Sequence, residues 1–219
     1  MNRSLMDPLK KILIVDDHAV LRHGLKKLLE DKPNRFVFGE AETPAEALDL
    51  VRGQLWDLVI LDISLGDNRS GLDLLKELKQ VDPQLRVLIL TMHAEEHYAL
   101  RAFKAGAVGY VRKDSPPEEV IRATDRVLAG AKYVSETMAE KLLAYIDNDF
   151  AFSPHELLSD REFQVLCLIA SGKTLTQIAE LLSLSDKTVG TYRARIMEKM
   201  AMKTNAELTH YAIRNNLVD

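Results

Sequence analysis

Polar side chains recur at the ends of short apolar runs in the first half of the sequence. Asp16 closes the run KILIVD and Asp17 follows it, Asp62 closes DLVILD, Thr91 closes RVLILT and Lys113 closes VGYVRK. Three carboxylates in one crevice repel one another unless a cation joins them, and such oxygen ligands suit Mg²⁺. A carboxylate beside that ion can attack a phosphoryl group, whose oxygens a lysine and a hydroxyl then hold. The set therefore predicts a pocket that makes and detects an aspartyl phosphate.

Each of these residues has a simpler explanation when it is taken alone. A single aspartate at a strand end is most often a helix cap, and a single lysine is most often solvated. The prediction therefore depends on all five residues sharing one edge of a sheet. The spacing of His18, His93 and His97 resembles no zinc site, so we expect surface or helix-start positions for them.

The apolar runs predict the strands that must position this pocket. They span residues 11–16, 36–41, 57–62, 86–91 and 108–113, with room for one helix in each gap. Several are continuously apolar, as expected for strands covered on both faces, and strand–helix alternation favours a parallel sheet. We expect an α/β doubly wound, five-stranded, flavodoxin-like domain. The strand order 2-1-3-4-5 is taken from that fold type, and it places the binding crevice between the first and third strands.

From about residue 147 the pattern changes to helices alone. Hydroxyl residues are followed three positions later by Glu or Gln at Ser159, Thr174 and Thr204, which is the capping-box spacing. With Ser185 as a further cap, four short helices are predicted, at residues 160–171, 175–182, 186–200 and 204–215. The short turn before the longer third helix is typical of a helix-turn-helix. We expect a small all-α domain.

The third of these helices has an unobstructed, basic outer face. At 100° per residue Val189, Ile196 and Met200 share the inner side. The residues that point the opposite way are Lys187, Thr191, Ala194 and Glu198, flanked by Gly190 and Arg195. Residues 185–203 hold five basic and two acidic side chains, a local charge of +3. These features suit entry into a DNA major groove. From charge alone, a solvated helix face in an interaction domain is equally well supported.

The composition of the chain excludes several other classes of protein. The chain has 219 residues, of which 47% are hydrophobic and 28% charged, as in a folded protein. One cysteine excludes a disulfide framework, and Cys167 is expected to pack in a core. No apolar run approaches the ~18 residues of a membrane span, and the N-terminus lacks a secretory core, so we expect a cytoplasmic location without membrane contact. The net charge of −4 does not itself indicate nucleic-acid binding.

The motifs ILIVDDH, VILDISL, LILT and AGAVGYVRK resemble the receiver domain of two-component response regulators, over residues 9–131. The resemblance implies that Asp62 accepts phosphate from a sensor histidine kinase. It also implies that Asp16 and Asp17 hold Mg²⁺ together with Asp62 and the backbone carbonyl of Ser64. Thr91, Lys113 and Tyr110 match the switch hydroxyl, the phosphate-binding lysine and the switch aromatic. Two departures are the proline-free loop 64–71 and Asp114 after Lys113, where receivers commonly have proline.

Residues 158–212 resemble the LuxR-type DNA-binding domain of NarL/FixJ-class response regulators, through LSDREFQVL and the frame KTV…R…I…K, and we expect the DNA-binding domain to span residues 158–219. Residues 132–157 form the intervening helix and linker. The resemblance implies DNA contacts by Thr188, Gly190, Arg193 and Lys199. These add to the outward residues of the same helix, Lys187, Thr191, Ala194 and Arg195. It also implies that the last helix mediates dimerisation on DNA.

Together these expectations describe a transcriptional regulator and not an enzyme. Phosphorylation of Asp62 would switch binding to paired half-sites in double-stranded DNA, through a homodimer. Two alternatives stay open. A Mg²⁺-dependent phosphohydrolase would use Asp62 as nucleophile, but Ser64 stands where such enzymes usually carry a second acid. A receiver that works without phosphate would not need the complete acidic set.

Overall fold

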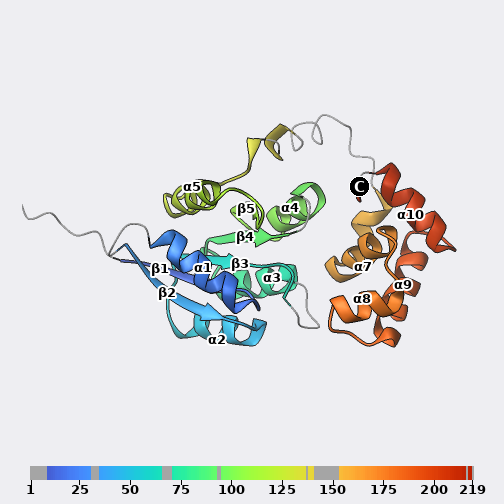
Figure 1. The fold of residues 1–219 in the computed structure, drawn as a ribbon, viewed down its shortest axis with the longest axis horizontal. Coiled ribbons are helices and arrows are strands. Elements are labelled where there is room, and N and C mark those ends of the chain that lie inside the picture. The colour runs from blue at the N-terminus through green and yellow to red at the C-terminus, as the bar shows by residue number, and fades with distance from the viewer. Residues whose placement is uncertain are drawn as a thin grey trace, which may run out of the picture.

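The computed structural model describes residues 9–30, 35–65, 71–92, 95–136, 138–140, 153–215 and 217–218. Figure 1 shows an α/β unit followed by a helical unit. The loop residues 66–70, His93 and most of the segment between the two units lie outside the described residues, and so do the expectations placed on them.

The sheet is parallel, with strand order β2-β1-β3-β4-β5, and this confirms the predicted fold. Its strands are β1 (Lys10–Val15), β2 (Phe36–Ala41), β3 (Leu58–Leu61), β4 (Val87–Thr91) and β5 (Gly109–Arg112). The three central strands β1, β3 and β4 are almost wholly buried because helices cover both of their faces.

Helices divide between the two faces of the sheet (Figure 1). One face carries α1 (Ala19–Leu29) and α5 (Pro117–Leu128), and the other carries α2 (Pro44–Gly53), α3 (Gly71–Val81) and α4 (Glu95–Lys104). Alternate strand residues therefore join different cores: Ile14 and Ile60 pack toward α1 and α5, whereas Val15 and Leu61 pack toward α2, α3 and α4.

The helical unit begins with a short 3₁₀ helix, η1 (Pro154–Leu157), inside the segment expected to be linker. The α-helices α7 (Asp160–Ala170), α8 (Leu175–Leu181), α9 (Asp186–Lys199) and α10 (Asn205–Arg214) follow. The capping boxes of Ser159 and Thr174 are complete, as predicted. Thr204 caps α10 but its box is not closed, because the Glu207 carboxylate accepts from the Lys203 N–H at 2.7 Å instead.

The core on the α3–α4 face continues into the helical unit. Leu72, Tyr98 and Tyr110 belong to the same buried cluster as Phe163 and Val189. Among the described helices, none is both long and apolar enough to cross a membrane.

One close approach fixes the packing of the edge strand β2. A Cβ placed on Gly39 would lie 2.2 Å from the Cη2 atom of Trp56, a ring that is itself buried. We expect Gly39→Ala to lower the free energy of unfolding by about 1–3 kcal/mol, because a rigid indole must move. Urea unfolding followed by the fluorescence of Trp56, the single tryptophan, measures this.

Gly53→Ala is the matched control. No atom lies within 4 Å of a Cβ placed there, and Gly53 ends α2. This variant should be neutral or stabilising by up to about 1 kcal/mol. Equal destabilisation by both substitutions would show that contact with Trp56 is not the cause.

Candidate functional site

The predicted pocket forms where β1, β3 and β5 end. Asp16, Asp62 and Lys113 each come directly after their strand, and Thr91 is the last residue of β4. Because the strands are parallel and in register, these ends meet at one edge of the sheet. Asp16, Asp62 and Thr91 are buried although they are polar, so their interactions decide whether the pocket is stable.

Lys113 joins the two buried carboxylates. Its Nζ lies 2.7 Å from Asp16 Oδ2 and 2.7 Å from Asp62 Oδ2. The Ser64 N–H donates to Asp62 Oδ1 at 3.0 Å, so both oxygens of Asp62 are engaged. The ammonium therefore supplies the positive charge that the crowded acids require.

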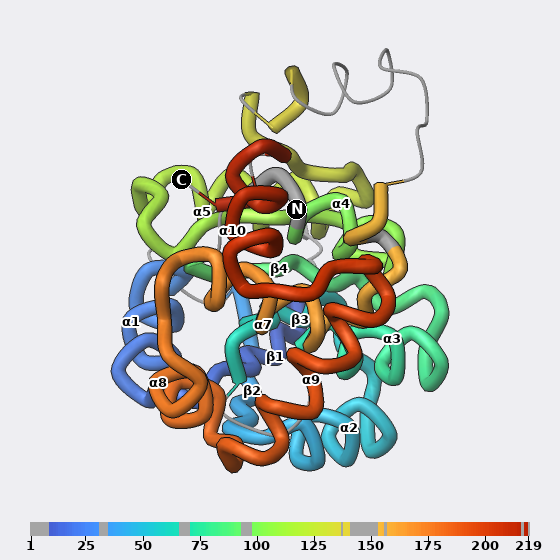
Figure 2. The backbone as a smooth tube through the Cα atoms, turned by 90° about the vertical axis from the view of Figure 1, so that its right-hand side faces the viewer, coloured from blue at the N-terminus to red at the C-terminus, as the bar shows by residue number. Residues whose placement is uncertain are grey.

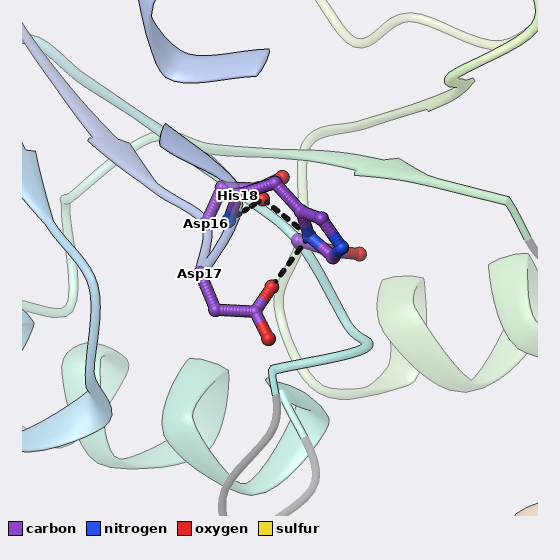
Figure 3. Close-up of side chains that lie close together, drawn as sticks. Asp16, Asp17 and His18 are labelled. Carbon is purple, nitrogen blue, oxygen red and sulfur yellow. Dashed lines mark hydrogen bonds and ion pairs between the residues drawn. The ribbon is translucent and has the colours of Figure 1, made fainter. Parts of the chain in front are cut away.

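His18 faces Asp17, the more exposed of the acids at the pocket (Figure 3). Its Nδ1 lies 2.7 Å from Asp17 Oδ1 and 3.2 Å from Asp16 Oδ1, while its backbone N–H donates to Asp16 at 2.8 Å. As expected, the residue stands at a helix start, since it is the N-cap of α1. Ligand atoms of Asp16, Asp17, His18 and Asp62 lie within 4.8 Å of one another, close enough to share one cation.

The pKa values in the pocket reflect burial opposed by charge pairing. Burial raises the pKa of Asp62, and the neighbouring Lys113 ammonium opposes this rise without cancelling it. Burial alone would lower the pKa of Lys113, but Asp62 and Asp16 outweigh that effect and its pKa is raised. Lys113 is therefore a fixed cation at neutral pH.

The other two predicted receiver residues lie in the core beside the pocket. Thr91 has no solvent exposure, and Tyr110 on β5 is buried with its ring in the α3–α4 core. Tyr110 thus occupies an inward position in this structure.

Two supporting residues were not predicted. Arg22 of α1 is buried and donates to the Asp16 carbonyl at 2.7 Å, with Glu40 and Glu42 as its carboxylate partners. Gly71 starts α3 so close to the pocket that a Cβ there would lie 2.5 Å from the Asp62 carbonyl oxygen. A lone arginine within a helix, or a glycine after a loop, gives no sequence signal for either role.

The expected DNA face of α9 is exposed in the helical unit. Val189, Ile196 and Met200 are buried, as predicted. The side chains of Lys187, Thr191, Ala194 and Arg195 are exposed, while Thr188, Gly190 and Arg193 are half-buried.

Internal partners hold two of the expected DNA contacts. Lys199 Nζ lies 2.6 Å from Glu162 Oε2, and Arg193 Nε donates to Asn205 Oδ1 at 2.6 Å. Burial would raise the pKa of Glu162, but Lys199 and Ser159 bring it below its usual value. Lys199 therefore connects α9 to the first turn of α7.

Arg22 offers a direct test of how the pocket is supported. We expect Arg22→Met to lower the free energy of unfolding by about 2 kcal/mol, because it removes charged hydrogen bonds to the Asp16 carbonyl and to two carboxylates. The control is Arg52→Met, whose exposed guanidinium lies 3.7 Å from Asp49 and should matter by less than about 0.5 kcal/mol. Denaturant unfolding compares them, and equal effects would contradict a supporting role for Arg22.

Comparison with known proteins gives the same two-part organisation. Residues 12–125 match the response regulator receiver domain, and residues 156–212 match the bacterial regulatory proteins of the luxR family. The chain is 34% identical over 207 residues to the response regulator UvrY of Escherichia coli (strain K12), covering 94% of each protein. It is 35% identical over 210 residues to the response regulator GacA of Pseudomonas aeruginosa, covering 95% of this chain and 98% of GacA.

A solved structure of RcsB from Salmonella enterica serovar Typhimurium, bound to promoter P1flhDC in the presence of phosphomimetic BeF3⁻, is also similar. Its TM-score is 0.59 at 26% identity, covering 94% of this chain and 98% of that one. The chain therefore belongs to the two-component response regulators: it is a phosphorylation-switched, DNA-binding transcriptional regulator with a receiver domain and a luxR-type domain.

Proposed function

We propose that Asp62 is the residue that carries the phosphoryl group. The observation that supports this most strongly is the buried pair of carboxylates that Lys113 bridges at the carboxyl ends of β1 and β3. Asp62 Oδ1 accepts the backbone N–H of Ser64, and Oδ2 faces the lysine. One Asp62 oxygen would attack phosphorus as the bond from phosphorus to the donor's leaving group breaks. Lys113 and the Thr91 hydroxyl then hold the transferred oxygens.

The donor set fits a magnesium ion. The three carboxylates of Asp16, Asp17 and Asp62, with the Ser64 carbonyl, offer the hard oxygen ligands that Mg²⁺ takes in phosphoryl-transfer sites. When bound, Mg²⁺ would neutralise the charge that develops on the phosphoryl oxygens. The Lys113 ammonium already compensates part of the same acidic charge. The pocket therefore has one cation of its own in addition to the proposed Mg²⁺.

The remaining parts of the proposal concern the phosphoryl donor, the switch residue, the domain bounds and the DNA contacts. The phosphoryl donor is a sensor histidine kinase, and Tyr110 responds to the occupied pocket as the switch aromatic. The receiver comprises residues 9–131 and the DNA-binding domain residues 158–219. Two copies pair on promoter half-sites of double-stranded DNA, in the cytoplasm where bacterial DNA lies. Lys187, Thr191, Ala194 and Arg195 contact the major groove, with Thr188, Gly190 and Arg193 at its margin; Lys199, which Glu162 holds, lies beside them without a phosphate contact of its own.

We expect Asp62→Asn to abolish labelling of the chain by radioactive acetyl phosphate, because the amide cannot form an acyl phosphate. Asp49→Asn is the control, since Asp49 is an exposed aspartate of α2, and it should label like the wild type. Autoradiography after gel separation reads both. Undiminished labelling of the Asp62 variant would place the phosphoryl group on another residue.

The salt dependence of DNA binding separates the two cations of α9. Arg195 is exposed, so Arg195→Ala should reduce the slope of log K against log salt by about 1. Lys199 is held by Glu162, so Lys199→Met should leave that slope nearly unchanged and lower the free energy of unfolding by about 1 kcal/mol. Fluorescence anisotropy on a duplex selected from a random pool measures the slopes. The reverse pattern would make Lys199 the phosphate contact.

A further inference from the structure

A buried aspartate of the DNA-binding domain joins two cations of the receiver. Asp160, the first residue of α7, is only 6% exposed. Its Oδ2 lies 2.7 Å from Lys76 Nζ on α3, and its Oδ1 lies 2.9 Å from Arg101 Nη1 on α4. We call these three residues the inter-domain clamp. Because Asp160 is buried, losing its partners would leave an uncompensated charge.

Arg101 makes most of the contacts of this clamp. Besides Asp160, its guanidinium donates to the Leu158 carbonyl at 3.0 Å and to the His155 carbonyl at 2.7 Å. Its Cζ also lies 4.3 Å from the centre of the Phe163 ring. One receiver side chain therefore holds η1, the loop before α7 and the first turn of α7 at the same time.

Aromatic packing completes the contact between the domains. The rings of Tyr98 on α4 and Phe163 on α7 meet edge to face, with centroids 5.3 Å apart. The Tyr98 hydroxyl interacts with the thiol of Cys167, whose pKa burial raises to about 12. The interface thus contains a buried aromatic contact as well as charged groups. Tyr98 shares its core with Tyr110, so the helix that carries Arg101 also borders the switch aromatic.

This interface leaves the DNA face of α9 free. Helix α7 contacts the receiver through Asp160 and Phe163, and it also packs against α9. The buried side of α9 is the side of Val189 and Ile196, so its opposite side points away from α7 and the receiver. Figure 1 shows α7 nearest the receiver, and Figure 2, viewed from the side of the helical unit, shows α9 in front. Lys187 and Arg195 are exposed accordingly.

We infer that the clamped, unphosphorylated chain binds a single DNA half-site, and that the receiver controls the pairing of two copies and not access to α9. The inference rests on the proposed DNA contacts of α9. The clamp fixes the DNA-binding domain relative to a bulky receiver. Two DNA-binding domains on one promoter must take up the relative position that the half-site spacing sets. A receiver fixed to each of them restricts how the two domains can adjust to that spacing. When the pocket is phosphorylated, movements of Thr91 and Tyr110 reach Arg101 of the clamp through α4.

The test uses the full-length protein and duplexes selected from a random pool by the beryllofluoride-loaded chain, trimmed to one or two half-sites. We expect beryllofluoride with Mg²⁺ to change the Kd for one half-site by less than about twofold and to tighten binding to two half-sites by about tenfold or more. A tenfold gain on the single half-site would overturn the inference, because α9 would then be masked before loading.

Arg101→Gln tests the clamp itself. Without beryllofluoride, this variant should bind two half-sites about threefold or more tighter than the wild type and one half-site equally well. Arg52→Gln, which changes an exposed arginine of α2, is the control and should match the wild type. Unchanged binding of Arg101→Gln to two half-sites would overturn the role of the clamp. If neither the loaded nor the unloaded chain binds any selected duplex, the proposed DNA contacts fail, and the inference falls with them.

Discussion

The bridge from Lys113 to Asp16 and Asp62 is the interaction on which the receiver depends. Two carboxylates that are almost fully buried repel one another unless a cation lies between them. Lys113 meets that need at 2.7 Å from each, and it does so from β5, two strands away from β3 in the sheet. The pocket therefore holds one fixed positive charge, which the proposed phosphoryl group would meet when it arrives.

The same bridge connects chemistry to the DNA-binding domain. Thr91 and Tyr110 border the pocket on β4 and β5, and α4 lies between these strands in the chain. Tyr98 and Arg101 on α4 contact α7 directly, so the buried core is continuous from the acidic pocket to the helix that supports α9. This continuous, stiff core is the route by which the inference above would couple a rearrangement at the pocket to the domain contact.

Sequence alone predicts the parts of this molecule that depend on local rules. The strand runs, the caps at Ser159 and Thr174, and the inner stripe of α9 follow from residue type and spacing. The contacts of Arg22 and Arg101 do not, because they join residues 18 and 59 positions apart on elements that become neighbours only after folding. The Thr204 box was expected and is incomplete, since the Lys203 N–H offered Glu207 a competing partner.

The most direct test of the central claim is chemical mapping of the phosphoryl group. The chain is phosphorylated with acetyl phosphate in Mg²⁺ and reduced with borohydride, which converts an aspartyl phosphate to homoserine, and peptide mass spectrometry then locates the reduced residue. Conversion at Asp62 alone is the result that the bridged pocket predicts. Conversion at a different residue, with Asp62 intact, would contradict it.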